Sequence, residues 1–272
     1  MTQNEAHHAS ARRLWERAMR TRSHVSRAFL VAELARGHPA SASRIALAAA
    51  RDDDARERAL AASVLGALAS SRTDARRSRA ALVRLVGDPR ASVVAAAAAA
   101  LASFAPFFGA RSVYTGLAVS SERSVRMAAA HTLAHWASEG RQWPLVLLGS
   151  LSVSADANTR WTAIFGLANA PIASSAGRET ATRQWLSRAA SDEDAEVAIE
   201  ALGGLVLHGV ASRALVVEVL QRRDVLRLPA FVLAEALAPM PRRSAQFSIV
   251  RVERSVGRRL TRLRAEMAKD GE

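Results

Sequence analysis

The chain has 272 residues, contains no cysteine and carries a formal net charge of +13 at pH 7. The lack of cysteine excludes disulfides and thiolate metal sites. Half of the residues are hydrophobic but only 5% are aromatic, and the abundance of alanine favours closely packed helices over strands. The composition therefore predicts an all-α protein.

The N-terminal region is expected to begin with disorder over residues 1–8. A first helical pair is predicted at residues 9–21 and 24–36, closed by Gly37 and Pro39. The basic first twenty residues lack an apolar segment of secretory-signal length, which predicts a cytoplasmic protein.

A signature recurs along the chain in which a small residue follows an arginine by three positions and a leucine follows it by seven. Its best copies have identical spacing: Arg58, Ala61, Val64, Leu65 and Gly66; Arg126, Ala129, Thr132, Leu133 and Ala134; Arg160, Ala163, Gly166, Leu167 and Ala168. Weaker copies place the arginine position at Arg27, Val94, Ala198 and Arg227. The average step of about 33 residues is typical of a helical solenoid.

Each repeat is predicted to contain a helix A, a turn and a helix B that carries the signature. The A helices are indicated by apolar residues at helical spacing around Ile45, Leu82, Leu117, Leu145, Leu186 and Val216. Acidic and hydroxyl residues precede each B helix, where they can cap the unpaired N–H groups. These acids need no catalytic explanation.

The domain prediction is one repeat array over residues 9–241, followed by a basic capping helix and tail over residues 242–272. The helical part of that final segment is expected at about 244–268. Residues 91–110 are uncharged over a length that could cross a membrane. Their alanine content and their place in the repeat favour a buried helix, so no integral membrane segment is predicted.

The signature resembles that of the HEAT-repeat family, in which an Asp-containing turn precedes a Val-Arg pair and a small-Leu-Gly step ends the second helix. The resemblance covers roughly residues 9–240. It implies a right-handed α-α superhelix of about seven helix pairs, whose B helices line a concave surface that holds other macromolecules.

The recurrent arginine is predicted to form a structural ladder between turns, with Arg58, Arg126 and Arg160 as its best members. In likeness to HEAT arrays, the residues one, two and five positions after it should face the concave groove. The candidate partner-binding residues are Phe29, Leu60, Met127, His131, Trp161, Phe165 and Ile199. This mostly apolar strip favours a protein or peptide partner, although the same side chains could instead pack between adjacent B helices.

The positive charge lies in residues 12–27, 72–90 and 242–272. Such clusters suit nucleic acid or an acidic partner. The candidate contacts are Arg76, Arg77, Arg79, Arg254, Arg258, Arg259 and Arg262. All basic residues except Lys269 are arginine, a bias that a GC-rich genome would also produce.

No phosphate loop, metal-spaced cluster or nucleophile elbow occurs in the sequence. His131 and His135 have a metal-compatible spacing without a third ligand nearby. We therefore predict no catalytic residue, metal or cofactor, and a non-catalytic protein-binding scaffold or adaptor of unspecified oligomeric state. The alternative is a DNA-binding protein that resembles HEAT-like alkylpurine DNA glycosylases, with Trp136, Trp161, Arg160 and Glu200 as candidates.

Overall fold

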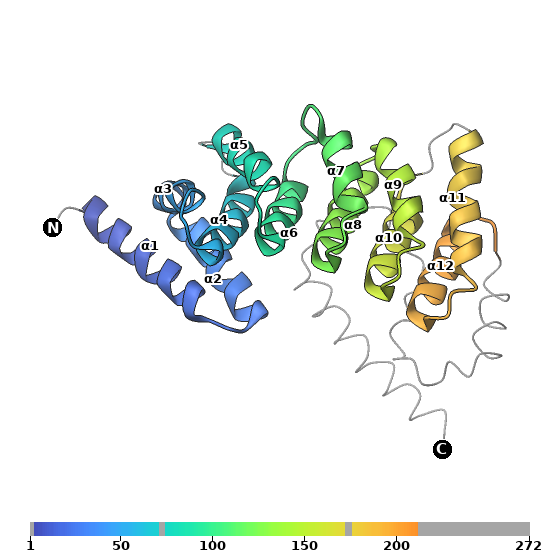
Figure 1. Cartoon of the computed structure of the whole chain (residues 1–272), viewed down its shortest axis with the longest axis horizontal. Helices are drawn as coiled ribbons and strands as arrows, with labels where there is room; N and C mark the ends of the chain where they lie inside the picture. Colours follow the sequence, from blue (N-terminus) through green and yellow to red (C-terminus); the bar gives the residue numbers. More distant parts are fainter. Residues whose placement is uncertain (1–2, 71–73, 172–175, 212–272) are drawn as a thin grey trace, which may run out of the picture. The chain divides into compact units, whose positions relative to one another are not determined.

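The computed structural model describes residues 3–70, 74–171 and 176–211, and every regular element in these ranges is helical (Figure 1). The prediction of an all-α protein is therefore confirmed for the described part of the chain. The chain divides into two compact units, Met1–Trp136 and Ala137–Glu272, and each is considered by itself.

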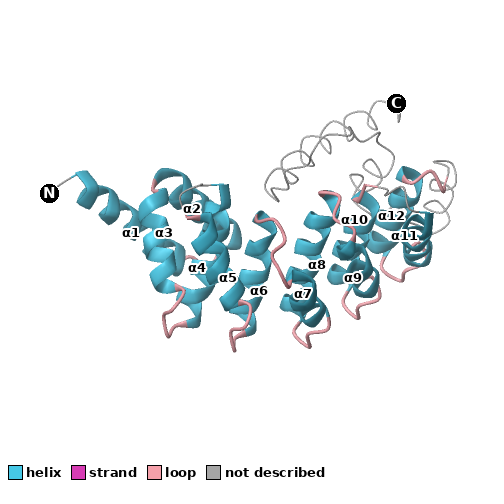
Figure 2. Cartoon of the chain, turned by 90° about the horizontal axis from the view of Figure 1, so that it is seen from above, coloured by secondary structure: helices cyan, strands magenta, loops and turns pink. Residues whose placement is uncertain are grey.

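The first unit contains a series of helices in its described residues (Figures 1 and 2). They are α1 (Gln3–Arg20), α2 (His24–Gly37), α3 (Pro39–Ala49), α4 (Ala55–Ala67), α5 (Ala75–Leu85), α6 (Ala91–Ala100), α7 (Ala110–Ala118) and most of α8 (Arg123–Ser138), with short 3-10 turns at Leu68–Ser70 and Leu101–Ser103. Helix α1 begins at Gln3, so it includes residues 3–8, for which the sequence predicts disorder. This stretch contains glutamine, glutamate and alanine, which favour helix.

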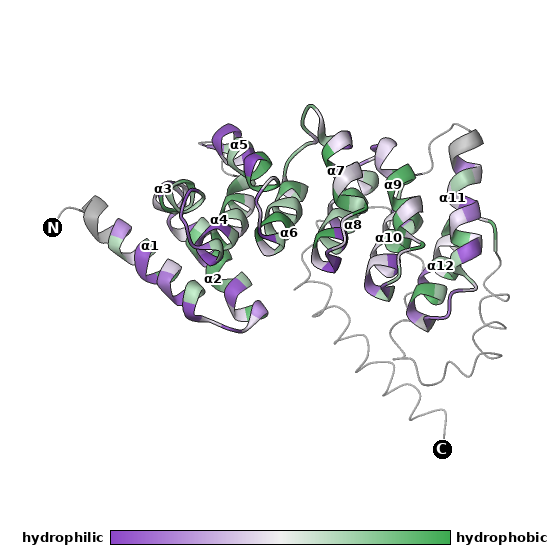
Figure 3. Cartoon of the chain, viewed as in Figure 1, coloured by the Kyte–Doolittle hydropathy of each residue, from purple (hydrophilic) through white to green (hydrophobic). Residues whose placement is uncertain are grey.

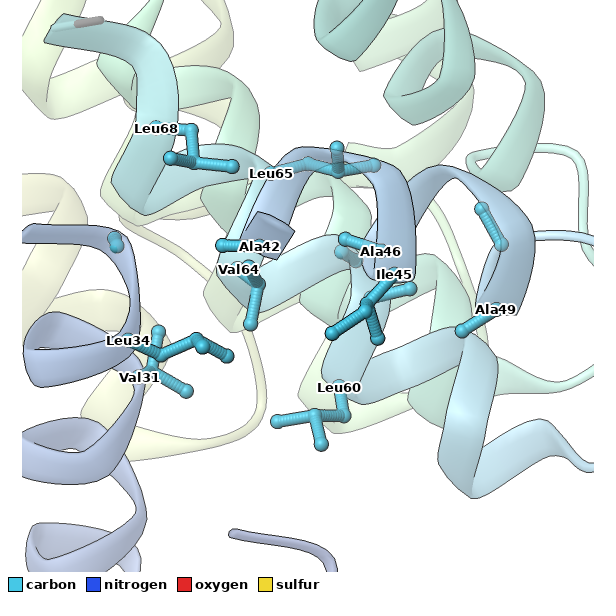
Figure 4. Packing of buried hydrophobic residues seen from close by; sticks show 14 of the residues in the cluster. Val31, Leu34, Ala42, Ile45, Ala46, Ala49, Leu60, Val64, Leu65 and Leu68 are labelled. Carbon is cyan, nitrogen blue, oxygen red and sulfur yellow. The ribbon is translucent and has the colours of Figure 1, made fainter. Parts of the chain in front are cut away.

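The core of the first unit forms from the apolar stripes of these helices (Figure 4). Leu34 from α2, Ile45 from α3 and Leu65 from α4 belong to one buried cluster. Gly66 lets α4 approach α6 closely, because a Cβ at this position would lie 2.7 Å from the Cβ of Ala100. A small residue in the signature is therefore required by helix packing.

A second set of buried contacts joins α6, α7 and α8. The hydroxyls of Tyr114 and Thr132 each donate to the carbonyl of Ala98 at 2.8 Å. Tyr114 also packs edge-to-face against Trp136, with ring centroids 4.9 Å apart, and the Trp136 indole N–H donates to the carbonyl of Phe104 at 2.9 Å. These aromatic residues are therefore part of the core.

The second unit contains four further helices within its described residues: α9 (Trp143–Leu151), α10 (Ala157–Asn169), α11 (Ala176–Ala189) and α12 (Ala195–Leu207). Leu148, Ile164 and Leu186 are fully buried among them. A Cβ at Gly204 would lie 2.7 Å from the Cβ of Ala168. The close approach of α10 and α12 thus repeats the contact between α4 and α6.

Neighbouring helices of the first unit differ in hydropathy (Figure 3). Helix α6 contains only alanine and valine apart from Ser92 and is mostly apolar, whereas α5 is strongly hydrophilic on part of its surface. No helix in the described ranges is both long and apolar enough to cross a membrane. The repeat copy at Arg227 and the capping segment 242–272 lie outside the described residues.

Candidate functional site

The signature arginines hold the turn that precedes their own B helix. In four B helices the guanidinium donates to the main-chain carbonyl six residues earlier, at 2.7–3.0 Å: Arg27 to Thr21, Arg58 to Asp52, Arg126 to Ser120 and Arg160 to Ser154. Because these carbonyls precede the helix, they would otherwise lack a partner within it. The arginine therefore fixes the turn from A to B.

Two of these arginines also reach an aspartate in the following turn of the same unit. Arg58 donates through Nε and Nη2 to the two carboxylate oxygens of Asp88, at 2.7 and 3.1 Å. Arg160 binds Asp192 in the same way, with both distances 2.8 Å. The bond from Arg58 lowers the pKa of Asp88, although burial opposes that shift. Such two-point pairs fix orientation as well as charge.

The exposed fraction of these side chains decides their role. The Arg58 and Arg160 side chains are 14% and 9% exposed, and the bonds just described occupy most of their donors. Their guanidinium groups are therefore engaged within the chain and present little positive charge to a ligand.

The turns contain a further regularity that is not part of the repeat signature. The residue six positions before the signature arginine position carries a side-chain oxygen in all six described copies: Thr21, Asp52, Asp88, Ser120, Ser154 and Asp192. In four of them this oxygen accepts from the main-chain N–H two residues later, at 2.8–3.2 Å. These hydrogen bonds close Asx turns at the three aspartates and an ST turn at Ser120. A search at this offset would have found them in the sequence.

The exposed residues of the B helices differ in part from those that the sequence predicted for the concave groove. Leu60 and Ile199 are only 4% and 2% exposed, so their assignment as partner contacts is wrong. Both side chains turn toward the core, because in these two helices the stripe packed against neighbouring helices extends to the predicted position. Phe29, Met127 and Trp161 are 64%, 42% and 37% exposed, whereas His131 and Phe165 are half-buried.

The candidate contacts belong to different units, with Met127 and His131 in the first and Trp161 and Phe165 in the second. The latter two rings stack one turn apart on α10, with centroids 5.5 Å apart and planes inclined by 24°. Neighbouring polar side chains bond to the backbone of the same helix: Thr162 donates to the carbonyl of Asn158 at 2.8 Å, and Asn169 to that of Phe165 at 2.9 Å. The outward face of α10 thus combines two aromatic rings with uncharged polar groups.

His131 on α8 is half-buried, and its Nδ1 is buried without a hydrogen-bond partner. Burial, and to a smaller extent the nearby His135, lower the pKa of His131, so the ring is neutral at pH 7. The described residues contain no group of three or more His, Cys, Asp or Glu side chains that could hold a metal ion.

The basic candidates on α5 are only partly committed to internal contacts. Arg77 lies 3.8 Å from the carboxylate of Asp74, Arg76 is exposed and Arg79 is half-buried. The other four candidates, Arg254, Arg258, Arg259 and Arg262, lie outside the described residues. Two of the glycosylase candidates are unsuited to a base-binding site: Trp136 is fully buried and the Arg160 side chain is engaged as described above.

Comparison with known proteins gives a fold and no family. No protein-family model matches the chain, and no curated protein matches it. Among solved structures, the chain is similar to the crystal structure of the YibA protein of Escherichia coli, with 19% identity and a TM-score of 0.59 over 87% of this chain and 85% of that one. At this identity the likeness shows the fold alone.

Proposed function

We propose that this chain is a non-catalytic scaffold that binds a protein partner through the concave face of a HEAT-like array, which its B helices line. The proposal includes a right-handed HEAT-like solenoid as the framework. What supports it is that equivalent contacts recur at equivalent positions. An arginine–aspartate fork and a close contact between small residues link α4 to the next repeat in the first unit, and link α10 to the next repeat in the second. Repetition of one junction is the defining property of a solenoid.

The single observation that carries the binding function is the stacked pair of Trp161 and Phe165. Trp161 exposes 37% of its surface although apolar rings usually gain free energy by burial. A rigid aromatic pair can bury a large area on a partner at a small entropic cost, and tryptophan is among the residues that contribute most at interfaces. A protein surface can bury both rings of this pair at once, so we propose a protein as the partner.

The neighbouring chemistry favours protein over nucleic acid. The polar residues beside the rings on α10 are uncharged, and Arg160 on the same helix is engaged by Asp192. A groove that follows a phosphate backbone needs several available cationic side chains. On this face of α10, stacking and burial are therefore the main sources of affinity.

The test compares the wild-type chain with Trp161→Ala/Phe165→Ala and with a control, Val146→Ala/Val153→Ala. The control removes apolar side chains that are each 57% exposed in the same unit. Affinity purification from the organism that encodes the chain identifies partners, and binding is then measured with purified components. We expect the aromatic variant to lose at least about ten-fold in affinity and the control to change little.

Two further measurements make this result specific. Far-ultraviolet circular dichroism should show equal helicity in all three proteins, and hydrogen exchange should show protection of α10 when the partner is bound. Undiminished binding by the aromatic variant, or protection that avoids α10, would refute the proposed site.

A further inference from the structure

An open cleft of about 650 Å³ lies in the first unit where α1 turns into α2. Its lining includes Arg17, Arg20, Thr21, Val25, Phe29 and Leu30. The volume is within the range of sites that bind small molecules or short peptide segments. Phe29, which the sequence analysis placed in a groove of B helices, thus lies beside the last turn of α1.

The turn that shapes this cleft is held by local hydrogen bonds. Ser23 caps α2 by accepting from the N–H of Ser26 at 3.3 Å, and Arg27 donates to the carbonyl of Thr21 at 2.7 Å. The last turn of α1 therefore faces the first two turns of α2 across a short connection with fixed geometry. The backbone of the cleft is therefore preformed, and the ordering cost of binding is confined to side chains such as those of Arg17 and Arg20.

The two sides of the cleft differ in chemistry. Val25 and Phe29 lie one turn apart on α2 and are each 64% exposed. Arg17 and Arg20 are exposed on α1, and neither forms an ion pair with any described residue. Glu16 on the same helix pairs instead with Arg12, at 3.5 Å. The cleft therefore combines two arginines that lack a carboxylate partner with an apolar wall.

We propose that this cleft binds an acidic peptide segment that also carries apolar side chains. Carboxylates of the peptide pair with the guanidinium groups of Arg17 and Arg20, while an apolar side chain packs on Val25 and Phe29. This complementarity accounts for both sides of the cleft. The site goes beyond the proposed function, because it is a second surface on the other unit and does not require the aromatic pair of α10.

Other occupants fit less well. A nucleic acid would use the two arginines, but the tracking of phosphates needs a longer row of cations and leaves the apolar wall without a role. The segment 242–272 of the chain itself contains nine basic and four acidic residues. Its net charge would repel the arginines.

The test measures the fluorescence anisotropy of a labelled peptide that alternates glutamate and leucine, titrated with the full chain. We expect Arg17→Ala/Arg20→Ala and Phe29→Ala each to weaken binding by about five- to ten-fold, and Arg17→Lys/Arg20→Lys to retain part of the affinity. The control Arg51→Ala/Arg56→Ala removes the same charge from exposed positions outside the cleft. It should change the affinity less than about two-fold.

Three comparison probes complete the design: lysine in place of glutamate, serine in place of leucine, and a single-stranded oligonucleotide. The proposal is overturned if the wild-type chain fails to bind the glutamate–leucine peptide, or if the serine peptide or the oligonucleotide binds equally well. It is also overturned if the control variant loses as much affinity as Arg17→Ala/Arg20→Ala. The Trp161→Ala/Phe165→Ala variant should bind the peptide normally, so that failure here is separable from failure of the α10 site.

Discussion

Replacement of Arg160 by methionine tests the structural role of the signature arginine. Methionine keeps the length of the apolar stem but removes every donor. Arg160 makes five hydrogen bonds: two to the carboxylate of Asp192 and two to the carbonyls of Ser154 and Ala155, at 2.8–3.1 Å, and a longer one of 3.4 Å to the exposed Glu193. The substitution therefore leaves a poorly exposed carboxylate and two carbonyls without this partner.

The magnitude follows from how far each group remains solvated. The removal of one member of a fully buried ion pair costs about 3–5 kcal/mol. The Asp192 side chain is 11% exposed, and its Oδ1 keeps the bond from the N–H of Asp194 at 2.9 Å. We therefore expect the free energy of unfolding to fall by about 2–3 kcal/mol. This corresponds to a decrease of about 1 M in the urea midpoint.

The assay is urea unfolding of the full chain, followed by circular dichroism, with Arg188→Met as the control. Arg188 is an exposed arginine on α11 of the same unit, and its replacement should alter stability by less than about 0.5 kcal/mol. Hydrogen exchange in α10 and α12 reports the local effect if unfolding occurs in steps. A stability of Arg160→Met equal to that of the control would refute the structural role.

Three further predictions concern buried groups and use the same urea assay. Tyr114→Phe removes a buried hydroxyl that donates to a main-chain carbonyl, and should cost about 1 kcal/mol; no loss would contradict this role. Gly204→Ala places a methyl carbon 2.7 Å from the Cβ of Ala168, and should cost about 1–3 kcal/mol, so an unchanged midpoint would show that α10 and α12 are not in close contact. Burial lowers the pKa of His131 and of His208 below the ordinary 6.5, and the unfolded chain therefore binds protons more readily at these positions. Stability should consequently fall as the pH drops below about 6.5, and substitution of both residues by glutamine should reduce this slope.

The alternation of helices could be predicted because its signals are local. Helix α4 begins after Asp54, whose carboxylate accepts from the N–H of Arg56 at 2.8 Å, and α10 begins after Asp156, which accepts from the N–H of Thr159 at 2.9 Å. Capping residues and apolar spacing lie within a few positions of the elements that they specify. The sequence alone therefore sufficed to place these B helices.

The direction of individual side chains could not be predicted in the same way. Phe29 and Leu60 occupy the same place in the signature, two positions after the arginine, yet they are 64% and 4% exposed. Leu60 belongs to the core cluster of the first unit, whereas Phe29 lies in the open cleft beside α1. Because such a position is at the edge of the apolar stripe, its burial depends on which neighbouring helix covers it. The neighbour is a property of tertiary structure.

Two copies of the signature have no arginine. Val94 and Ala198 occupy its position, and the turns before them contain Asp88 and Asp192. Each aspartate still accepts from a main-chain N–H in its own turn and receives the fork of the preceding arginine. Such a copy has no hydrogen bond from an arginine to the main-chain carbonyl six residues earlier. The fork from the preceding arginine to the aspartate of its turn is present.

The number of residues between a signature arginine and the aspartate of the next turn explains where the arginine–aspartate fork forms. The fork joins residues 30 and 32 positions apart, at Arg58 with Asp88 and at Arg160 with Asp192. Arg27 and Asp52 occupy the corresponding places but are separated by only 25 residues, and Arg27 forms no ion pair with a described residue. Helix α3 follows α2 with a single residue, His38, between them, which leaves less chain to bring the next turn within reach. The presence of an arginine and an aspartate at these positions is therefore insufficient to form the fork. The chain between them must also be long enough to place the aspartate opposite the preceding guanidinium. Where it is, the fork forms even if the following copy has no arginine of its own.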